Sequence, residues 1–304
     1  MLPKLCGCKG IRVCGLCSSA NAVFLDEKDG LCFNLCCICR LAYHHAHQCG
    51  LSKNENEFLF TNVDVMLDFV SESEESLLID SLDKDPWSLS QSGRRKQDYG
   101  PKVNFKRRRI SYDGFSGLPS YSCFLVNRIN KTISCNPQMG QISFQPVELC
   151  NLEYCPDRTS CIVPHLDDVW LWGSRLITLN LCSDTVLTFT LPDSSDSPEV
   201  LSEIERIRGS LSESYACKIS DNLAVRVPLP KRSLVIVDGP ARYVWFHSIR
   251  PSDIRSRRIA MTFRELSELF LPPVSGMVLN ADQQIGKHLL EIAASYKGVP
   301  RSVS

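Results

Sequence analysis

The chain has 304 residues, 43% of them hydrophobic, and its 34 Lys and Arg balance 34 Asp and Glu. The length allows one large domain with an appendage or two modest domains. Zero net charge excludes an argument for a nucleic-acid partner from overall charge, so electrostatic arguments must be local. No apolar run is long enough for a transmembrane helix, and the N-terminus lacks the apolar core of a signal peptide. We therefore expect an intracellular protein without membrane contact.

The first 50 residues hold nine of the sixteen cysteines and three of the six histidines. In a reducing compartment, such cysteines are expected to be thiols or metal ligands rather than disulfides. Four of them would suffice for a tetrahedral zinc site: Cys6, Cys8, Cys14 and Cys17. A cysteine-rich tail without metal is the alternative. A second candidate set comprises His44, His45, His47 and Cys49. We place a boundary near residue 50, between a Cys/His-rich segment (1–50) and a folded domain (51–304).

The first predicted helix covers residues 72–84. Ser71 and Glu74 have the spacing of a capping box, and Pro86 ends the helix. Its apolar face is expected to contain Leu77, Leu78 and Leu82.

Residues 91–110 carry eight Lys or Arg and one Asp. Gly93, Gly100 and Pro101 favour loops and ribbons there rather than helix. This basic ribbon suits phosphate groups. It would also suit an acidic protein surface, or be a solvated loop.

From about residue 122 the pattern predicts short strands separated by turns, which is typical of a β-sandwich or barrel. A polar insertion at about 192–221 interrupts the strands and contains a predicted helix near 198–211. A second helix is expected near 282–296, where Gly298 and Pro300 follow. The fold class is therefore mainly β with flanking helices (α+β).

The segment Pro164-His165-Leu166-Asp167-Asp168 carries the candidate chemistry. On an extended backbone His165 and Asp167 project to the same face, so both can reach one metal ion. Of the two other histidines after residue 50, His247 follows a strand and turn, whereas His288 lies in the predicted C-terminal helix. Two imidazoles and one carboxylate leave open positions on a metal, as in non-haem iron oxygenases. A His-x-Asp pair also occurs by chance, and zinc hydrolases use the same residue types.

Arg258 and Arg264 stand six residues apart in a strand-like segment, so they share a face with Ala260 and Thr262 between them. Guanidinium groups that face a sheet interior need anions, and Arg binds carboxylates in bidentate fashion. A dicarboxylate such as 2-oxoglutarate fits this pair. An exposed edge strand with two solvated arginines is the alternative.

These segments resemble the AlkB family of iron(II)- and 2-oxoglutarate-dependent dioxygenases. The resemblance rests on five strings: CGCKGIRVC-x-x-C (6–17), SQSGRRKQDYGPKVNF (90–105), NLEYCP (151–156), PHLDD-WLWG-RL (164–176) and RRIAMTFREL (257–266). It implies a double-stranded β-helix, or jelly-roll, core. Residues 18–57 match nothing in the family, and the 82 residues from His165 to His247 are a long interval, for which the polar insertion accounts.

The resemblance also implies residue roles. His165, Asp167 and His247 would bind iron(II). Arg258 would pair with the distal carboxylate of 2-oxoglutarate, and Arg264 would lie nearer the metal-side carboxylate or the substrate. Tyr154 and Asn151 match positions that hydrogen-bond 2-oxoglutarate, although two residues separate them where some relatives have one. Asp168 would orient the site.

The implied reaction is oxidative demethylation of an N-methyl group with O2 as co-substrate, and with release of succinate, CO2 and formaldehyde. Similar members act on methyl-lysine in protein, actin in particular, and on N6-methyladenine in DNA. We expect a monomer located in the cytoplasm and nucleus. Trp170 and Trp172 would stack on a base or belong to the core.

Two other functions remain open. The chain could be a catalytically idle β-helix that serves as a binding or scaffold module with a zinc-binding tail. It could also be a zinc-dependent hydrolase that is indifferent to 2-oxoglutarate.

Overall fold

Most of the chain folds into two seven-stranded sheets and a two-stranded hairpin. This computed structural model describes residues 31–45, 47–50, 55–135, 142–192, 197–219, 223–273 and 278–301. One sheet, here called the β16 sheet, has the order β4 (Val63–Met66), β14 (Leu234–Val237), β11 (Trp172–Leu181), β16 (Arg258–Leu266), β9 (Pro146–Tyr154), β6 (Arg95–Tyr99) and β5 (Ser88–Leu89). The other, the β12 sheet, has the order β10 (Ile162–His165), β15 (Phe246–Ile249), β12 (Thr185–Thr190), β13 (Ala224–Leu229), β1 (Cys32–Leu35), β2 (Leu41–Tyr43) and β3 (Glu57–Leu59). The hairpin comprises β7 (Lys102–Asn104) and β8 (Arg109–Ser111).

The eight strands from β9 to β16 pass back and forth between the two sheets. In chain order, β9, β11, β14 and β16 belong to the β16 sheet, and β10, β12, β13 and β15 belong to the β12 sheet. All pairs within this set are antiparallel. Two antiparallel sheets connected in this way form a jelly roll, so the expected fold class agrees with the observed strand order.

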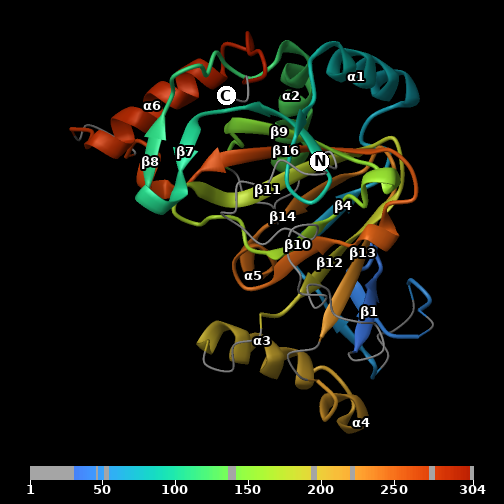
Figure 1. Ribbon diagram of the computed structural model, residues 1–304. Coiled ribbons are helices and arrows are strands. Elements are labelled where there is room, and N and C mark those ends of the chain that lie inside the picture. The colour runs from blue at the N-terminus through green and yellow to red at the C-terminus, as the bar shows by residue number, and fades with distance from the viewer. Residues whose placement is uncertain are drawn as a thin grey trace, which may run out of the picture.

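Helices cover the outer face of the β16 sheet. The longer ones are α1 (Glu72–Lys84), α2 (Cys123–Cys135), α3 (Pro198–Arg208) and α6 (Ala281–Ala293). Short helices are α4 (Glu213–Ala216), α5 (Gly239–Tyr243), η1 (Phe105–Arg107), η2 (Ser120–Ser122), η4 (Pro156–Arg158), η5 (Pro251–Asp253) and η6 (Glu268–Phe270). Figure 1 shows α1, α2 and α6 along one side of the β16 sheet, with α3 and α4 at the other end of the molecule. None of the helices in the described part of the chain has the length and apolar character that a membrane span needs.

Two apolar cores follow from the period-2 alternation of β16. Ile259, Met261 and Phe263 join the core beneath α1, α2 and α6, whereas Ala260 faces the core between the two sheets. The same strand therefore carries one set of side chains toward the helices and the other toward the space between the sheets.

Several expected elements are confirmed. α1 spans Glu72–Lys84, and its capping box uses Ser71 and Glu74. Leu78 and Leu82 are buried, but Leu77 is 67% exposed, so the expected apolar face was one residue too wide. α3 and α6 also lie where helices were predicted.

The expectation of strands from residue 122 is wrong for Cys123–Cys135, which form α2. Leu125, Val126, Ile129 and Ile133 are buried there, and their spacing of one, three and four residues is helical. Three β-branched residues among these four concealed the helix, because such residues favour strands by propensity alone.

The chain before residue 50 is not separate from the jelly roll. β1 pairs in parallel with β13, and β2 pairs with β3, which begins at Glu57. The boundary expected near residue 50 therefore falls between two paired strands of one sheet. The candidate zinc ligands Cys6, Cys8, Cys14 and Cys17 lie outside the described residues.

Candidate functional site

A pocket of about 610 Å³ of empty volume, measured to its mouth, lies between the two sheets. This size is in the range of small-molecule sites. The lining residues are Leu152, Tyr154, Ile162, His165, Asp167, Leu176, Thr178, Leu187, Leu229, Val235, Val237, His247, Ile249, Arg258, Ala260, Thr262 and Arg264. All four residues of the even face of β16 are present, which confirms that Arg258 and Arg264 share a face with Ala260 and Thr262.

The pocket brings together His165, Asp167 and His247. His165 on β10 is the register partner of His247 on β15, and the centroids of their rings are 4.4 Å apart. Nε2 of His165 lies 3.6 Å from Oδ1 of Asp167, and one ligand atom from each of the three lies within 4.8 Å of the others. His288 is elsewhere, on α6, where its ring contacts Tyr112.

The three side chains are held in the protonation states that a metal requires. A hydrogen bond of 2.9 Å joins Nδ1 of His165 to the carbonyl oxygen of Val163, which assigns the proton to Nδ1 and leaves Nε2 free. Burial lowers the pKa of His247 to about 3, so its imidazole is neutral. Burial alone would raise the pKa of Asp167, but the guanidinium of Arg264 holds it well below its usual range.

Two neutral imidazoles and a carboxylate fit a divalent iron ion with open positions. The side chain of His165 is 20% exposed, so the site can be reached from solvent.

Arg258 lies in the same pocket and has an unused donor. Its Nε donates to Oδ1 of Asn180 at 2.7 Å, and its guanidinium lies 4.7 Å from the centroid of the Tyr154 ring. Its Nη1 is buried and has no hydrogen-bond partner among the described residues. A buried charged donor without a partner costs free energy, and a carboxylate in the pocket would satisfy it. The residues present therefore fit 2-oxoglutarate.

Arg264 differs from Arg258 because its donors are already used. Nε donates to Oδ2 of Asp167 at 2.9 Å, and Nη1 donates to Oε2 of Glu148 at 2.7 Å. The guanidinium therefore neutralises Asp167 and fixes the plane of its carboxylate beside the two histidines.

The assignment of Asn151 to the co-substrate site is wrong. Asn151 is fully buried, but its Nδ2 donates to Gln97 and to the hydroxyl of Tyr121 on the other face of β9. Leu152 and Tyr154 line the pocket instead. Residues three apart on a strand point to opposite faces, so Asn151 and Tyr154 cannot both reach one ligand.

Asp168 and the two tryptophans support the site rather than line it. Oδ1 of Asp168 accepts the backbone N–H of Leu171 at 3.0 Å, which holds the turn after the His-x-Asp pair. Trp172 is 4% exposed, and the ring of Trp170 packs edge-on against Phe270. Both tryptophans therefore belong to the core.

Arg242 is a site residue that the sequence did not reveal. It lies on α5, is 1% exposed, and donates to the backbone carbonyls of Asp167 and Asp168 at 2.9 and 3.0 Å. These bonds hold the backbone that carries the carboxylate ligand. A charged residue inside the otherwise apolar segment before His247 was the available signal.

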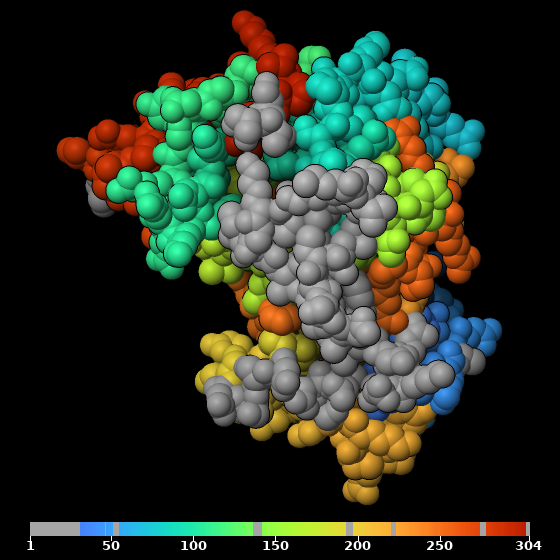
Figure 2. Space-filling model, in the orientation of Figure 1, coloured from blue at the N-terminus to red at the C-terminus, as the bar shows by residue number. Residues whose placement is uncertain are grey.

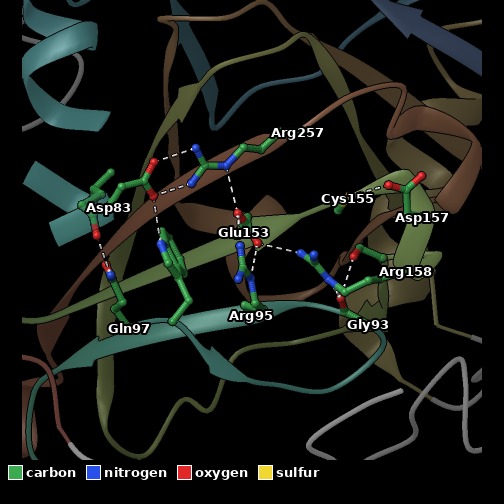
Figure 3. A network of polar contacts seen from close by, with 12 residues as sticks. Asp83, Gly93, Arg95, Gln97, Glu153, Cys155, Asp157, Arg158 and Arg257 are labelled. Carbon is green, nitrogen blue, oxygen red and sulfur yellow. Dashed lines mark hydrogen bonds and ion pairs between the residues drawn. The ribbon is translucent and has the colours of Figure 1, made fainter. Parts of the chain in front are cut away.

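A network of ion pairs fixes the outer face of β9 behind Tyr154. Glu153 is 2% exposed and receives hydrogen bonds from Arg95, Arg158 and Arg257. Figure 3 shows these side chains converging on Glu153, with Arg257 continuing to Asp83. Arg95 of the basic ribbon thus serves the fold and is not available to a substrate.

No family model matches the chain. The human protein named alpha-ketoglutarate-dependent dioxygenase alkB homolog 4 is 41% identical over 97% of this chain and 95% of its own length. Its mouse counterpart is 39% identical over 97% and 96%. A Caenorhabditis elegans protein named DNA N6-methyl adenine demethylase is 32% identical over 88% of each chain. A solved structure titled "The structure of OsALKBH1" covers 68% of the chain at 12% identity with a TM-score of 0.42. The chain belongs to the AlkB family of 2-oxoglutarate-dependent dioxygenases and is similar to its fourth homologue.

Proposed function

We propose that this dioxygenase binds iron(II) through His165, Asp167 and His247, binds 2-oxoglutarate through Arg258, and removes methyl groups from nitrogen. The observation that carries the proposal is the unpaired Nη1 of Arg258 in the same pocket as the three candidate ligands. The three donors leave metal positions open, and the buried cation gives a dicarboxylate its second anchor.

The residues of the chain position the reactants. Neutral His165 and His247, with the Arg264-paired Asp167, hold the metal site in one geometry. Arg242 fixes the backbone of Asp167. The apolar side chains of the pocket exclude water from the reacting atoms.

When bound, iron(II) supplies the oxidative chemistry, in which 2-oxoglutarate and O2 give succinate, CO2 and one oxygen atom for a substrate C–H bond. On an N-methyl group the product is N–CH2OH. Its C–N bond then breaks, the nitrogen regains its proton, and formaldehyde leaves.

For the substrate, we propose N6-methyladenine in DNA. The name of the C. elegans relative supports this class. The hairpin of β7, η1 and β8 supports it independently, because its five basic residues are exposed: Lys102, Lys106, Arg107, Arg108 and Arg109. Figure 2 shows this hairpin at the molecular surface beside α6. Such cations attract phosphates. Methyl-lysine in an actin-like protein is the competing substrate.

The test compares single-stranded DNA that contains N6-methyladenine with a methyl-lysine peptide. We expect formaldehyde and unmethylated adenine in equal amounts from DNA. A Lys106→Ala/Arg107→Ala variant should reduce the salt dependence of DNA binding by about 0.7 in log–log slope per lost phosphate contact. The matched control is Lys84→Ala/Lys131→Ala, which removes two exposed cations on α1 and α2.

The outcomes separate the candidate functions. Turnover of the peptide alone would replace DNA with protein as the substrate. No turnover of either substrate, and no binding of iron with 2-oxoglutarate, would support the idle scaffold. Stoichiometric zinc at the three ligands would support a hydrolase.

A further inference from the structure

A second group of metal-ligand side chains lies far along the β12 sheet from the pocket. Cys36 and Cys39 belong to the turn between β1 and β2, and His47 and Cys49 follow β2. One ligand atom of each residue lies within 4.8 Å of the other three. Figure 1 places β1 at the end of the molecule opposite α1, and the N-terminal strands are at the surface in Figure 2.

We propose that Cys36, Cys39, His47 and Cys49 form a closed, structural zinc(II) site that anchors the N-terminal strands to the jelly roll. The spacing is Cys-x2-Cys-x7-His-x-Cys. Three thiolates and one imidazole are a tetrahedral zinc set, and four protein donors leave no position for a substrate. The expected set of His44, His45, His47 and Cys49 is therefore replaced by this one. Nδ1 of His44 bonds the carbonyl oxygen of Cys32 instead.

The distances suit one ion. Sγ of Cys39 lies 3.2 Å from Nε2 of His47. Zinc–sulfur and zinc–nitrogen bond lengths in a tetrahedron give ligand separations of about 3.6 Å for sulfur to nitrogen and about 3.8 Å for sulfur to sulfur. The measured separation and the 4.8 Å limit bracket these values, so small side-chain shifts would complete the tetrahedron.

An independent observation is the partner of His47. Its Nδ1 lies 2.8 Å from Oε1 of Glu57 on β3, and the two side chains are only 7% and 4% exposed. A metal-ligating histidine usually donates its second ring N–H to a carboxylate, which directs the other nitrogen at the metal. This hydrogen bond leaves Nε2 facing Cys39.

The turn is also built to hold a thiolate. The N–H of Arg40 donates to the carbonyl of Cys36 at 2.8 Å, and Arg40 has a φ of 60°, so the turn is tight. Burial alone would raise the pKa of the Cys36 thiol, but hydrogen bonds from the backbone of Cys39 and Ile38 lower it to about 6. Thiolate is the form that binds metals.

The site would link three consecutive pieces of the sheet. It joins the β1–β2 turn to the segment after β2, and Glu57 extends the link to β3. β1 in turn pairs with β13. Cys37 is the natural control because it lies in the same turn but outside the cluster, with its Sγ 3.7 Å from the carbonyl oxygen of Pro228.

The test is the zinc content of the full chain, purified under reducing conditions, with Cys39→Ser and Cys37→Ser in parallel. We expect Cys39→Ser to lose one zinc per chain and Cys37→Ser to lose none. Zinc at Cys6, Cys8, Cys14 and Cys17 would add equally to every variant, so the difference is the readout. Cobalt(II) in the wild type should give thiolate charge-transfer bands that weaken in Cys39→Ser only.

Two further measurements cover a variant that fails to fold. Glu57→Gln keeps all four ligands and should bind zinc about 10- to 100-fold more weakly in competition with a chromogenic chelator. Chelation of wild-type zinc should lower the unfolding temperature, and added zinc should restore it. Equal zinc in Cys39→Ser and Cys37→Ser, or a Cys36–Cys39 disulfide in the reduced preparation, would overturn the proposal. Neither outcome depends on demethylase activity, so failure here is distinct from failure of the proposed function.

Discussion

The two metal-ligand clusters of this chain differ in how their residues are brought together. Cys36, Cys39, His47 and Cys49 fall within one short segment. His165 and Asp167 meet His247 only because β10 and β15 pair across 82 residues of chain. The local cluster has four donors and is closed, whereas the long-range cluster has three and opens into a pocket.

This difference separates two uses of a metal ion. A cluster on a short segment gains order from its ion, because the chain between the ligands has few other contacts to fix it. A cluster on paired strands is positioned by the sheet before any ion binds. Removing metal should therefore change stability at the first cluster and chemistry at the second.

The largest expected effect is at the pocket. Asp167→Asn keeps an acceptor for Arg264 but removes the anionic ligand. Loss of residues that merely orient a ligand costs 10- to 100-fold in metal affinity, so we expect a loss of more than about 100-fold in iron(II) affinity and turnover. The measurement is an anaerobic titration that follows the charge-transfer band of iron with 2-oxoglutarate.

Asp168→Asn is the control for this change, because its side chain accepts one backbone N–H and does not line the pocket. It should retain most of the iron affinity. Equal losses in the two variants would remove Asp167 from the ligand set.

The next effect concerns the two adjacent arginines at the start of β16. Arg258→Ala should raise the KM for 2-oxoglutarate roughly 10- to 150-fold, which is the usual range for a hydrogen bond to a charged group. Arg257→Ala, on the opposite face, should leave this KM unchanged and cost about 1 kcal/mol of stability, because Glu153 retains Arg95 and Arg158. Succinate formation at varied 2-oxoglutarate measures both values. An unchanged KM in Arg258→Ala would contradict the proposed carboxylate site.

The smallest effect lies outside both clusters. Hydrogen bonds from Arg128 lower the pKa of Glu74 to about 2, against 4.5 for the free side chain. Stability from the ionised form is therefore complete above pH 4.5 and is lost as the pH falls through 2. Both side chains are about a third exposed, so Glu74→Gln should cost only about 0.5–1 kcal/mol at pH 7.

Glutamine still completes the capping box of α1, so this variant isolates the charge. Urea denaturation of both proteins from pH 2 to 7 should show their difference shrinking below pH 4.5. A difference that is constant with pH would mean that the ion pair is not its source.

By itself, the sequence determined the features that depend on short-range spacing. The capping box placed α1 at its observed first residue. The even spacing of Arg258 and Arg264 placed both in the pocket, because side-chain direction on a strand alternates with strict period 2. The His-x-Asp pair and the single later histidine outside the C-terminal helix gave three residues that the structure brings together.

Tertiary structure decided what depends on contacts between distant segments. Parity on β9 removed Asn151 from the pocket, and burial made Arg242 a support of the Asp167 backbone. The zinc ligand set required the fold of the β1–β2 turn, which selected Cys36 and Cys39 over their neighbours. Many cysteines and histidines stand close together in that segment, and only the direction of each side chain distinguishes a ligand from a bystander.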